Sequence, residues 1–381
     1  MTPVTPPTPL TAPADAPRRA TEPPRATEPP RGVVIAAPAE VGATATGPVR
    51  PDTSSPLGTS SPIRATLRPG TVVVVRDGRS VQVGLAPDRA VVVDAPAAVD
   101  ARRLAALLTG LEGGADLDSA ARRAGIDATG RTAVARILAR LADLGHVHLD
   151  APGPSAPALA PSTPARSTSA RSTPAPSATP ARARPAPVRR VHILGSGQVS
   201  EVLRGPLSVN GCRVSTGPTP GLALDAERPP WHRRGQAPDL VILTGTVSVD
   251  PVITAALSRA GQAHMHVYCR DGRVVVGPTV VPGLSTCLRC TDLFRARRDP
   301  RWPFVAAQLI GHSPDAGVPA LTAAAALVLA EVAATREPTG RMQTVGASVE
   351  INPAEGLWRR IEWPAVEGCD CGAAPGAHPL S

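Results

Sequence analysis

Residues 274–294 read Val274-Val-Val-Gly-Pro-Thr-Val-Val-Pro-Gly-Leu-Ser-Thr-Cys-Leu-Arg-Cys-Thr-Asp-Leu-Phe294, an apolar run that leads into two closely spaced cysteines, Cys287 and Cys290. A second pair, Cys369 and Cys371, lies near the end of the sequence. Structural zinc binds four thiolates at about 2.3 Å, and a two-residue spacer lets both sulfurs of a pair face one ion. We therefore predict a four-cysteine zinc site that joins these two segments.

Disulfide bonds and ordinary buried thiols are the alternatives to a metal site. We expect a cytoplasmic, reducing location, because the first residues contain no apolar run that could direct export. Paired cysteines in such a compartment usually bind metal or do redox work. A shell of four sulfurs leaves no open coordination position, so we expect structural rather than catalytic zinc. The remaining cysteines, Cys212 and Cys269, are predicted to be small core residues.

The composition sets the limits within which the chain can fold. The 381 residues include 46 prolines and 34 glycines, and all 40 basic residues are arginine because the sequence contains no lysine. The formal net charge is +9, but much of the excess lies in proline-rich segments, so we expect no nucleic-acid partner. The longest apolar run, 323–330, is too short for a bilayer, which requires about 20 residues, so we expect no membrane partner either.

Three segments are too rich in proline and polar residues to bury a core. These are an arm at 1–62, which contains the tandem repeat Ala20–Arg25 and Ala26–Arg31, a linker at 151–187 and a tail at 374–381. Such compositions favour disorder. Two folded units are predicted between them, one at 63–150 and one at 188–373.

The first unit begins with strand-like segments and then changes to helical periodicity. Strands are predicted at 71–76, 80–85 and 89–93, helices at 99–111 and 117–124 and from about 129 to 144, and a last strand at 146–149. Asp116 is expected to cap the second helix. This order of an α+β unit resembles the winged-helix, PqqD-like peptide-recognition element of ribosomal-peptide modification systems.

The resemblance implies that the leader of a precursor peptide adds as a strand beside the third strand and packs against the third helix. Strand addition uses main-chain hydrogen bonds at an unpaired sheet edge. The implied peptide-binding residues are Ala90, Val91, Val92, Val93, Val134, Ile137, Leu138 and Leu141. A DNA-binding winged helix is the alternative, with phosphate contacts from Arg122, Arg123, Arg131, Arg136 and Arg140. Interleaved acidic residues weaken it, since phosphate binding needs concentrated positive charge.

The second unit alternates strands and helices. The strand Arg190–Leu194 leads into Gly195-Ser-Gly197 and a helix start near Ser200, which is the beginning of a Rossmann-like nucleotide-binding fold. Further strands are predicted at 211–215, 238–244, 263–269 and 273–276, and a helix at 251–260. Alternation implies a parallel sheet with helices on both faces. A helix at 319–335 and a strand pair, 344–351 and 357–363, then bring the second cysteine pair near the first.

Together with the cysteine pairs, this α/β unit resembles the ThiF-type, ubiquitin-activating fold. The stretch 274–294, continued by 298–309, is similar to cyclodehydratase partner proteins of thiazole/oxazole-modified, bacteriocin-type peptide biosynthesis. Adenylating members of the fold use a lysine, an arginine and two acidic residues at ATP. Here Ser200 replaces a glycine, and the strand at 240–243 is followed by Thr244-Gly-Thr rather than Thr-Asp. The sequence therefore predicts a retained fold without adenylation.

The resemblance implies an accessory subunit rather than an enzyme. We expect it to bind a precursor leader and to present it to a YcaO-type cyclodehydratase, which uses ATP to form azoline and azole rings. Structural Zn²⁺ is the expected cofactor, ATP is not expected to bind the degenerate site at Gly195, Gly197 and Ser200, and a homodimer is compatible with the family. The alternatives are an active ATP-dependent ThiF-type adenylyltransferase and the DNA-binding regulator considered above.

Overall fold

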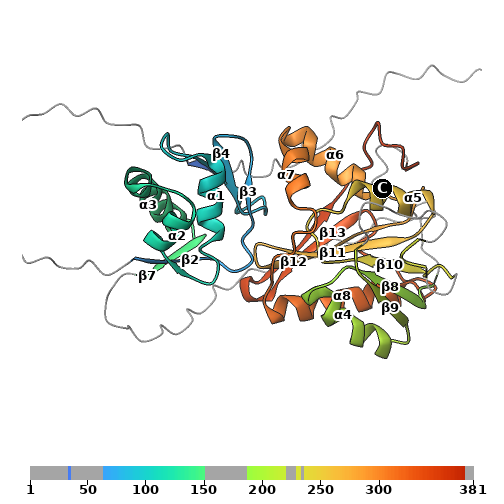
Figure 1. Ribbon diagram of the computed structural model, residues 1–381. Helices are drawn as coiled ribbons and strands as arrows, with labels where there is room; N and C mark the ends of the chain where they lie inside the picture. The colour runs from blue at the N-terminus through green and yellow to red at the C-terminus, as the bar shows by residue number, and fades with distance from the viewer. Residues whose placement is uncertain (1–32, 36–62, 151–186, 220–228, 233–235, 374–381) are drawn as a thin grey trace, which may run out of the picture.

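The computed structural model describes residues 33–35, 63–150, 187–219, 229–232 and 236–373. Most of the predicted arm, linker and tail therefore lies outside the described residues. The elements form two lobes: the first lobe comprises 63–150 with the strand at 33–35, and the second lobe comprises 187–373 (Figure 1). Within these ranges, no helix is long and apolar enough to cross a bilayer.

Three helices make up the helical part of the first lobe: α1 (Ala101–Thr109), α2 (Leu117–Arg123) and α3 (Ala128–Asp143). An aspartate caps the start of each one, because Asp100, Asp116 and Asp127 accept hydrogen bonds from backbone N–H groups in the first turn. These bonds satisfy donors that have no partner within the helix. The predicted cap at Asp116 is confirmed.

The strands of the first lobe form two small sheets. The first has the order β1-β5-β4-β3 and the second the order β6-β2-β7. Their bounds are β1 (Val33–Ile35), β2 (Arg64–Leu67), β3 (Val73–Val75), β4 (Ser80–Val83), β5 (Val91–Asp94), β6 (Ala115–Asp116) and β7 (Val147–Asp150). Strand β1 lies inside the predicted arm and pairs in parallel with β5. The expectation of an arm without regular structure therefore does not hold at 33–35.

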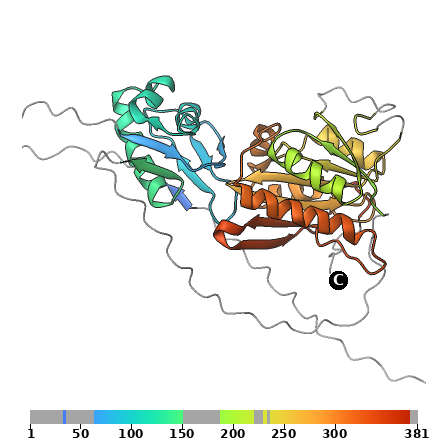
Figure 2. The ribbon, with the colours of Figure 1, turned by 90° about the horizontal axis from the view of Figure 1, so that it is seen from below.

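The second lobe is built on a seven-stranded sheet in the order β14-β13-β12-β11-β10-β8-β9. The strands are β8 (Arg190–Leu194), β9 (Arg213–Gly217), β10 (Leu240–Leu243), β11 (His264–Arg270), β12 (Arg273–Val280), β13 (Ala347–Asn352) and β14 (Leu357–Glu362). Helices α4 (Gln198–Val209) and α8 (Val318–Ala334) cover one face (Figure 2). Helices α5 (Pro251–Arg259), α6 (Leu288–Arg298) and α7 (Trp302–Gln308) lie on the other side (Figure 1). A short 3-10 helix, Pro353–Glu355, joins β13 to β14.

Only half of this sheet is parallel, which differs from the prediction. Strands β9, β8, β10 and β11 run parallel, whereas β12, β13 and β14 continue the sheet in antiparallel fashion. The change occurs at Asp271-Gly272, where both residues have positive φ. That conformation matches the two-residue hairpin turns that favour Asp-Gly. A hairpin between β11 and β12 leaves no room for a crossover helix, so the direction of the sheet must reverse there.

The hairpin tip and α7 hold the two lobes together. The Asp271 carboxylate accepts backbone hydrogen bonds from Leu85 and Ala86 of the first lobe, both at 2.6 Å. Arg273, 3% exposed, forms a bidentate pair with Asp88 at 2.8 and 2.9 Å. The Gln308 side chain of α7 both donates to the Val75 carbonyl and accepts from the Val75 N–H. Helix α7 therefore covers the outer edge of β3.

Candidate metal centre

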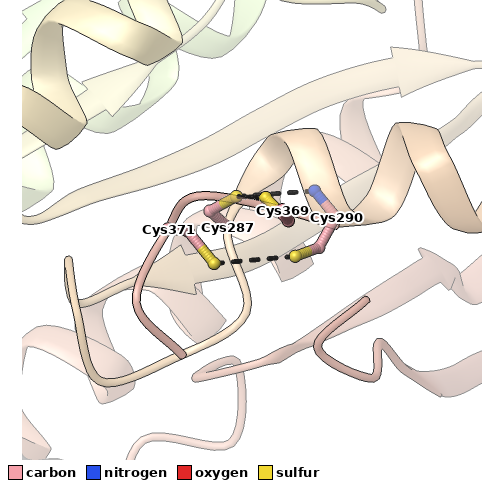
Figure 3. Close-up of side chains that lie close together, drawn as sticks. All are labelled: Cys287, Cys290, Cys369 and Cys371. Atoms are coloured by element: carbon pink, nitrogen blue, oxygen red, sulfur yellow. Dashed lines mark hydrogen bonds between the residues drawn. The ribbon is translucent and has the colours of Figure 1, made fainter. Parts of the chain in front are cut away.

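The four paired cysteines converge in the second lobe, as the sequence predicts. Cys287 is the N-cap of α6 and Cys290 lies in its first turn, whereas Cys369 and Cys371 lie on the turn that follows β14 (Figure 3). All four sulfurs lie within 4.8 Å of one another, and across the described residues this is the one group of three or more His, Cys, Asp or Glu side chains close enough to hold a metal ion.

The sulfur separations fit a tetrahedral ion rather than disulfides. The Sγ atoms of Cys287 and Cys369 are 3.6 Å apart, and those of Cys290 and Cys371 are 3.7 Å apart. Four ligands at about 2.3 Å around zinc define a tetrahedron with an edge of about 3.8 Å. A disulfide requires about 2.05 Å between sulfurs, so the two segments are not cross-linked covalently. The donor set, four thiols with nothing harder nearby, suits zinc.

The local electrostatics favour one thiolate and oppose further ones. A hydrogen bond from the Cys287 thiol lowers the pKa of Cys290 to about 5, and the Val366 N–H, 3.5 Å from that sulfur, acts in the same direction. The same hydrogen bond raises the pKa of Cys287, and burial raises the pKa of Cys369 to about 11. A cation must therefore compensate the charge if all four groups are to act as thiolate ligands.

The surrounding contacts fix the final turn against α6. Arg289, between the first two cysteines, pairs with Asp370, between the second two, at 3.1 Å. The Thr286 hydroxyl donates to the Trp363 carbonyl at 2.7 Å. Phe294 packs edge-on against Trp363, with ring centroids 5.8 Å apart. These contacts pre-position the ligands, which is the usual role of residues around a metal centre.

A groove of about 650 Å³ adjoins the cysteine cluster, between α5, α6 and α7. Its lining includes Trp302, from the short aromatic segment Trp302-Pro-Phe304, and the indole N–H of Trp302 donates to Asp292 at 3.0 Å. Trp302 is therefore held in place, whereas Phe304, on the same helix, is 52% exposed. The aromatic segment thus contributes one fixed side chain and one side chain open to solvent.

The predicted degenerate nucleotide site lies where β8 ends and α4 begins. Gly195 and Gly197 have φ values of 120° and 99°, and Ser200 is buried in the first turn of α4. A Cβ atom on Gly195 would lie 2.1 Å from the Thr244 carbonyl, and one on Gly245 would lie 2.5 Å from the Ser196 carbonyl. The two loops that follow β8 and β10 therefore pack backbone to backbone, in the place where a phosphate would approach.

A small cavity remains beside these loops, and Asp250 lines it. Its volume is about 90 Å³, and its walls include Thr244 and Thr246, whereas small-molecule and cofactor sites usually measure about 300–1,000 Å³. The loop thus brings Asp250 close to the carboxyl end of β10, although Asp250 comes well after β10 in the sequence. Its carboxylate accepts a hydrogen bond from the Val252 N–H at 2.8 Å and caps α5.

The predicted peptide-binding residues fall into two groups. Val91, Val92 and Val93 lie on β5, and Ala90 immediately precedes it. Val91 and Val93 belong to the core of the lobe, and so do the four predicted residues of α3, which are 0–2% exposed. These four residues are Val134, Ile137, Leu138 and Leu141. The part of the predicted groove that lies outside the core is therefore the outer backbone edge of β5, which pairs with β1 in this structure.

The arginines of the DNA-binding alternative are partly paired with acidic side chains. Arg131 lies 3.5 Å from Asp118 and Arg140 lies 3.5 Å from Asp143. These pairs reduce the positive charge that a phosphate backbone would meet.

Two residues that join the lobes, Asp271 and Gln308, were not identified from the sequence. Asp271 stands in an Asp-Gly dipeptide between two apolar runs, and this hairpin signal could have located it. Gln308, which covers the β3 edge, carries no comparable signal, because its role depends on how the lobes pack.

No family model matches the chain, and no curated protein matches it. Among solved structures it is similar to a heterocyclase in complex with substrate and cofactor, at 16% identity and a TM-score of 0.36, over 82% of this chain and 40% of that one. It is also similar to the E. coli microcin synthetase McbBCD complex, at 12% identity and 0.34, over 81% and 100%. A third similar structure is that of the microcin C7 biosynthetic enzyme MccB in complex with N-formylated MccA. The identity is 12% and the TM-score 0.37, over 81% of this chain and 100% of that one. The chain spans less than half the length of the heterocyclase, and these likenesses are too distant to assign a function.

Proposed function

We propose that this chain binds the leader of a ribosomally made precursor peptide and presents it to a YcaO-type cyclodehydratase for azoline and azole formation, without adenylating anything itself. The first lobe is the winged-helix, PqqD-like recognition element of this proposal, and the second lobe is a zinc-stabilised, ThiF-like scaffold. Residues 63–150 and 188–373 are the corresponding domains.

The observation that carries the proposal is the outer edge of β5, which accepts a further strand. Strand β5 pairs with β4 on one side, and on the other side it pairs with a short parallel strand from elsewhere in the chain. A sheet edge that takes an added strand is the physical requirement for recognition of an extended peptide. The other outer edge of this sheet, that of β3, is covered by Gln308, so within this sheet an incoming peptide has one edge to use.

The absence of adenylation is supported by the chemistry of the second lobe. Adenylyl transfer needs charge neutralisation around the phosphates. The sequence has no lysine, and the cavity beside Thr244 has about 90 Å³. The loops at Gly195 and Gly245 are packed against their neighbours with no space for a side chain. The groove of about 650 Å³ beside the metal centre is the surface that we assign to the cyclodehydratase.

The test is a reconstitution with the precursor peptide and the YcaO-type enzyme encoded in the same gene cluster. Mass spectrometry follows the loss of one water per ring formed. We expect efficient ring formation only when this chain is present, and little with a precursor that lacks its leader. Ring formation at the same rate without the chain would contradict the proposal.

An active adenylyltransferase is the second candidate, and the position of Asp250 favours it. This carboxylate lines the cavity at the end of β10, where an acidic residue could help to hold magnesium. Exchange of labelled pyrophosphate into ATP measures this activity directly. We expect no exchange. Exchange that disappears in Asp250→Ala would establish the second candidate instead.

A further inference from the structure

The edge of β5 already has an occupant, which is a segment of the same chain. Strand β1 runs parallel to β5, with Val33 opposite Val91, Val34 opposite Val92 and Ile35 opposite Val93. In residues 1–62, these are the only three consecutive apolar β-branched residues. Such residues have the highest preference for strands, so the proline-rich arm carries one short segment suited to this position.

The core holds β5 rigidly for such an addition. Val91 is 3% exposed and Val93 is fully buried, and both pack in the cluster that contains Ile137 and Leu141 of α3. Val92 and Asp94 are only partly buried. The backbone of β5 is thus fixed from one face and from β4, while its outer hydrogen-bonding groups face the partner strand, which in this structure is β1.

We infer that residues 33–35 act as an internal competitor at the β5 edge, which an incoming leader must displace. The competition with a leader rests on the proposed function, whereas the occupancy of the edge by this segment does not. The occupant also indicates the chemistry that the edge accepts: an extended peptide with a short apolar, β-branched stretch, bound mainly through its backbone. A leader that replaces the segment should carry a similar stretch.

The expected strength of this competition is modest, as a switch requires. Each hydrogen bond of the short pairing adds only a small net stabilisation, because water competes for the same groups, and ordering the backbone opposes it. Tethering supplies the segment at an effective concentration in the millimolar range. We therefore expect chains with β1 paired to β5 to outnumber chains with β1 released by about 3- to 30-fold. This ratio weakens the apparent affinity for the leader by about the same factor.

The first test uses the full-length double variant Val33→Pro/Val34→Pro. Backbone N–H groups alternate between the two sides of a strand, so one of two successive prolines must remove a donor that faces β5. The control, Ala43→Pro/Thr44→Pro, places the same change in the same arm. We expect amide exchange at Val91–Asp94 to accelerate about tenfold in the first variant only, with α3 unchanged. Equal exchange in the wild type and both variants would overturn the inference.

The second test supplies the segment in trans as a labelled peptide of residues 29–40. We expect it to bind the Val33→Pro/Val34→Pro chain with a dissociation constant of about 0.1–1 mM, and the wild type and control at least threefold more weakly. Equal binding to all three proteins would overturn the inference. Concentration-dependent dimers of the wild type that disappear in the double variant would also overturn it, because a second copy would then supply the strand.

The precursor leader separates this inference from the proposed function. If the leader binds the double variant 3- to 30-fold more tightly than the wild type, both stand. If the leader binds the wild type, the double variant and the control variant equally well, the inference fails and the proposed function stands. If it binds none of them while the exchange and peptide results hold, the proposed function fails and the internal occupancy stands.

Discussion

Replacing Cys290 by serine should remove the metal and loosen the second lobe. The cluster ties together positions that are far apart, since Cys287 and Cys369 are separated by 82 positions. On the chain-entropy model, closing a loop of that length restricts the unfolded chain by about 4.5 kcal/mol. Single domains have a total stability of about 5–15 kcal/mol. Loss of the metal cross-link between the two cysteine pairs would therefore remove a large part of the stability of this lobe.

The expected change in the melting temperature follows from that free energy. For a domain of 150–250 residues, 1 kcal/mol corresponds to about 2–4 °C, so Cys290→Ser should melt about 9–18 °C below the wild type. Tryptophan fluorescence reports this lobe alone, because all four tryptophans lie between Trp231 and Trp363. Elemental mass spectrometry should give one zinc per chain for the wild type and none for the variant.

Cys212→Ser is the matched control for this experiment. Cys212 is as buried as Cys287, at 6% exposure each, but it lies outside the cluster, and its sulfur receives a hydrogen bond from Arg336 at 2.9 Å. Serine keeps an acceptor there, so the control should retain zinc and lose about 1 kcal/mol. A Cys290→Ser chain that kept a full equivalent of zinc and melted with the wild type would refute the four-thiolate assignment.

Three further predictions concern two buried histidines, the carboxylate of Asp271 and the tight loop at Gly195. Burial lowers the pKa of His264 and of His266 to about 4 from 6.5, so the unfolded chain binds protons first as the pH falls. The free energy of unfolding should then decline as the pH falls from 6.5 to 4, by about 1.4 kcal/mol per pH unit for each of the two histidines. In urea titrations His264→Gln should reduce this slope by about 1.4 kcal/mol per pH unit, and an unchanged slope in His264→Gln would contradict it. Asp271→Asn weakens the contacts with Leu85 and Ala86, each bond to a charged group contributing about 1.5–3 kcal/mol, so small-angle scattering should show a larger radius of gyration. Gly195→Ala should lower the free energy of unfolding in urea by about 2 kcal/mol or more, because its Cβ would lie 2.1 Å from a carbonyl oxygen, and a smaller loss would show that the loops can separate.

The sequence predicted most of the elements because their signals are local. Helices α1, α2 and α3 follow from apolar periodicity and aspartate caps, and β8 is predicted with its observed bounds. The approach of the two cysteine pairs was also predicted, because the strand pair that precedes Cys369 returns the chain towards α6. A metal site restricts the type and spacing of its ligands more tightly than packing restricts core residues, so this site could be predicted from the sequence.

The features that escaped prediction depend on long-range packing. The contact of Gln308 with Val75 requires α7 to lie against the first lobe, and no local pattern reports this. The burial of Val134 and Ile137 follows from how α3 packs on the strands, because an apolar stripe on a helix fits a core and a groove equally well. Strand β1 is only three residues long and stands in a segment whose composition indicates disorder.

The account as a whole depends on peptide capture at β5 rather than on chemistry at the nucleotide loops. Amide hydrogen exchange of the full-length chain, with and without the precursor peptide and in the presence of ATP and magnesium, measures both places at once. We expect the peptide to protect Val91–Asp94 and to release Val33–Ile35, while ATP leaves 195–200 and 244–250 unchanged. Protection of those loops by ATP, with no effect of the peptide on β5, would contradict the account.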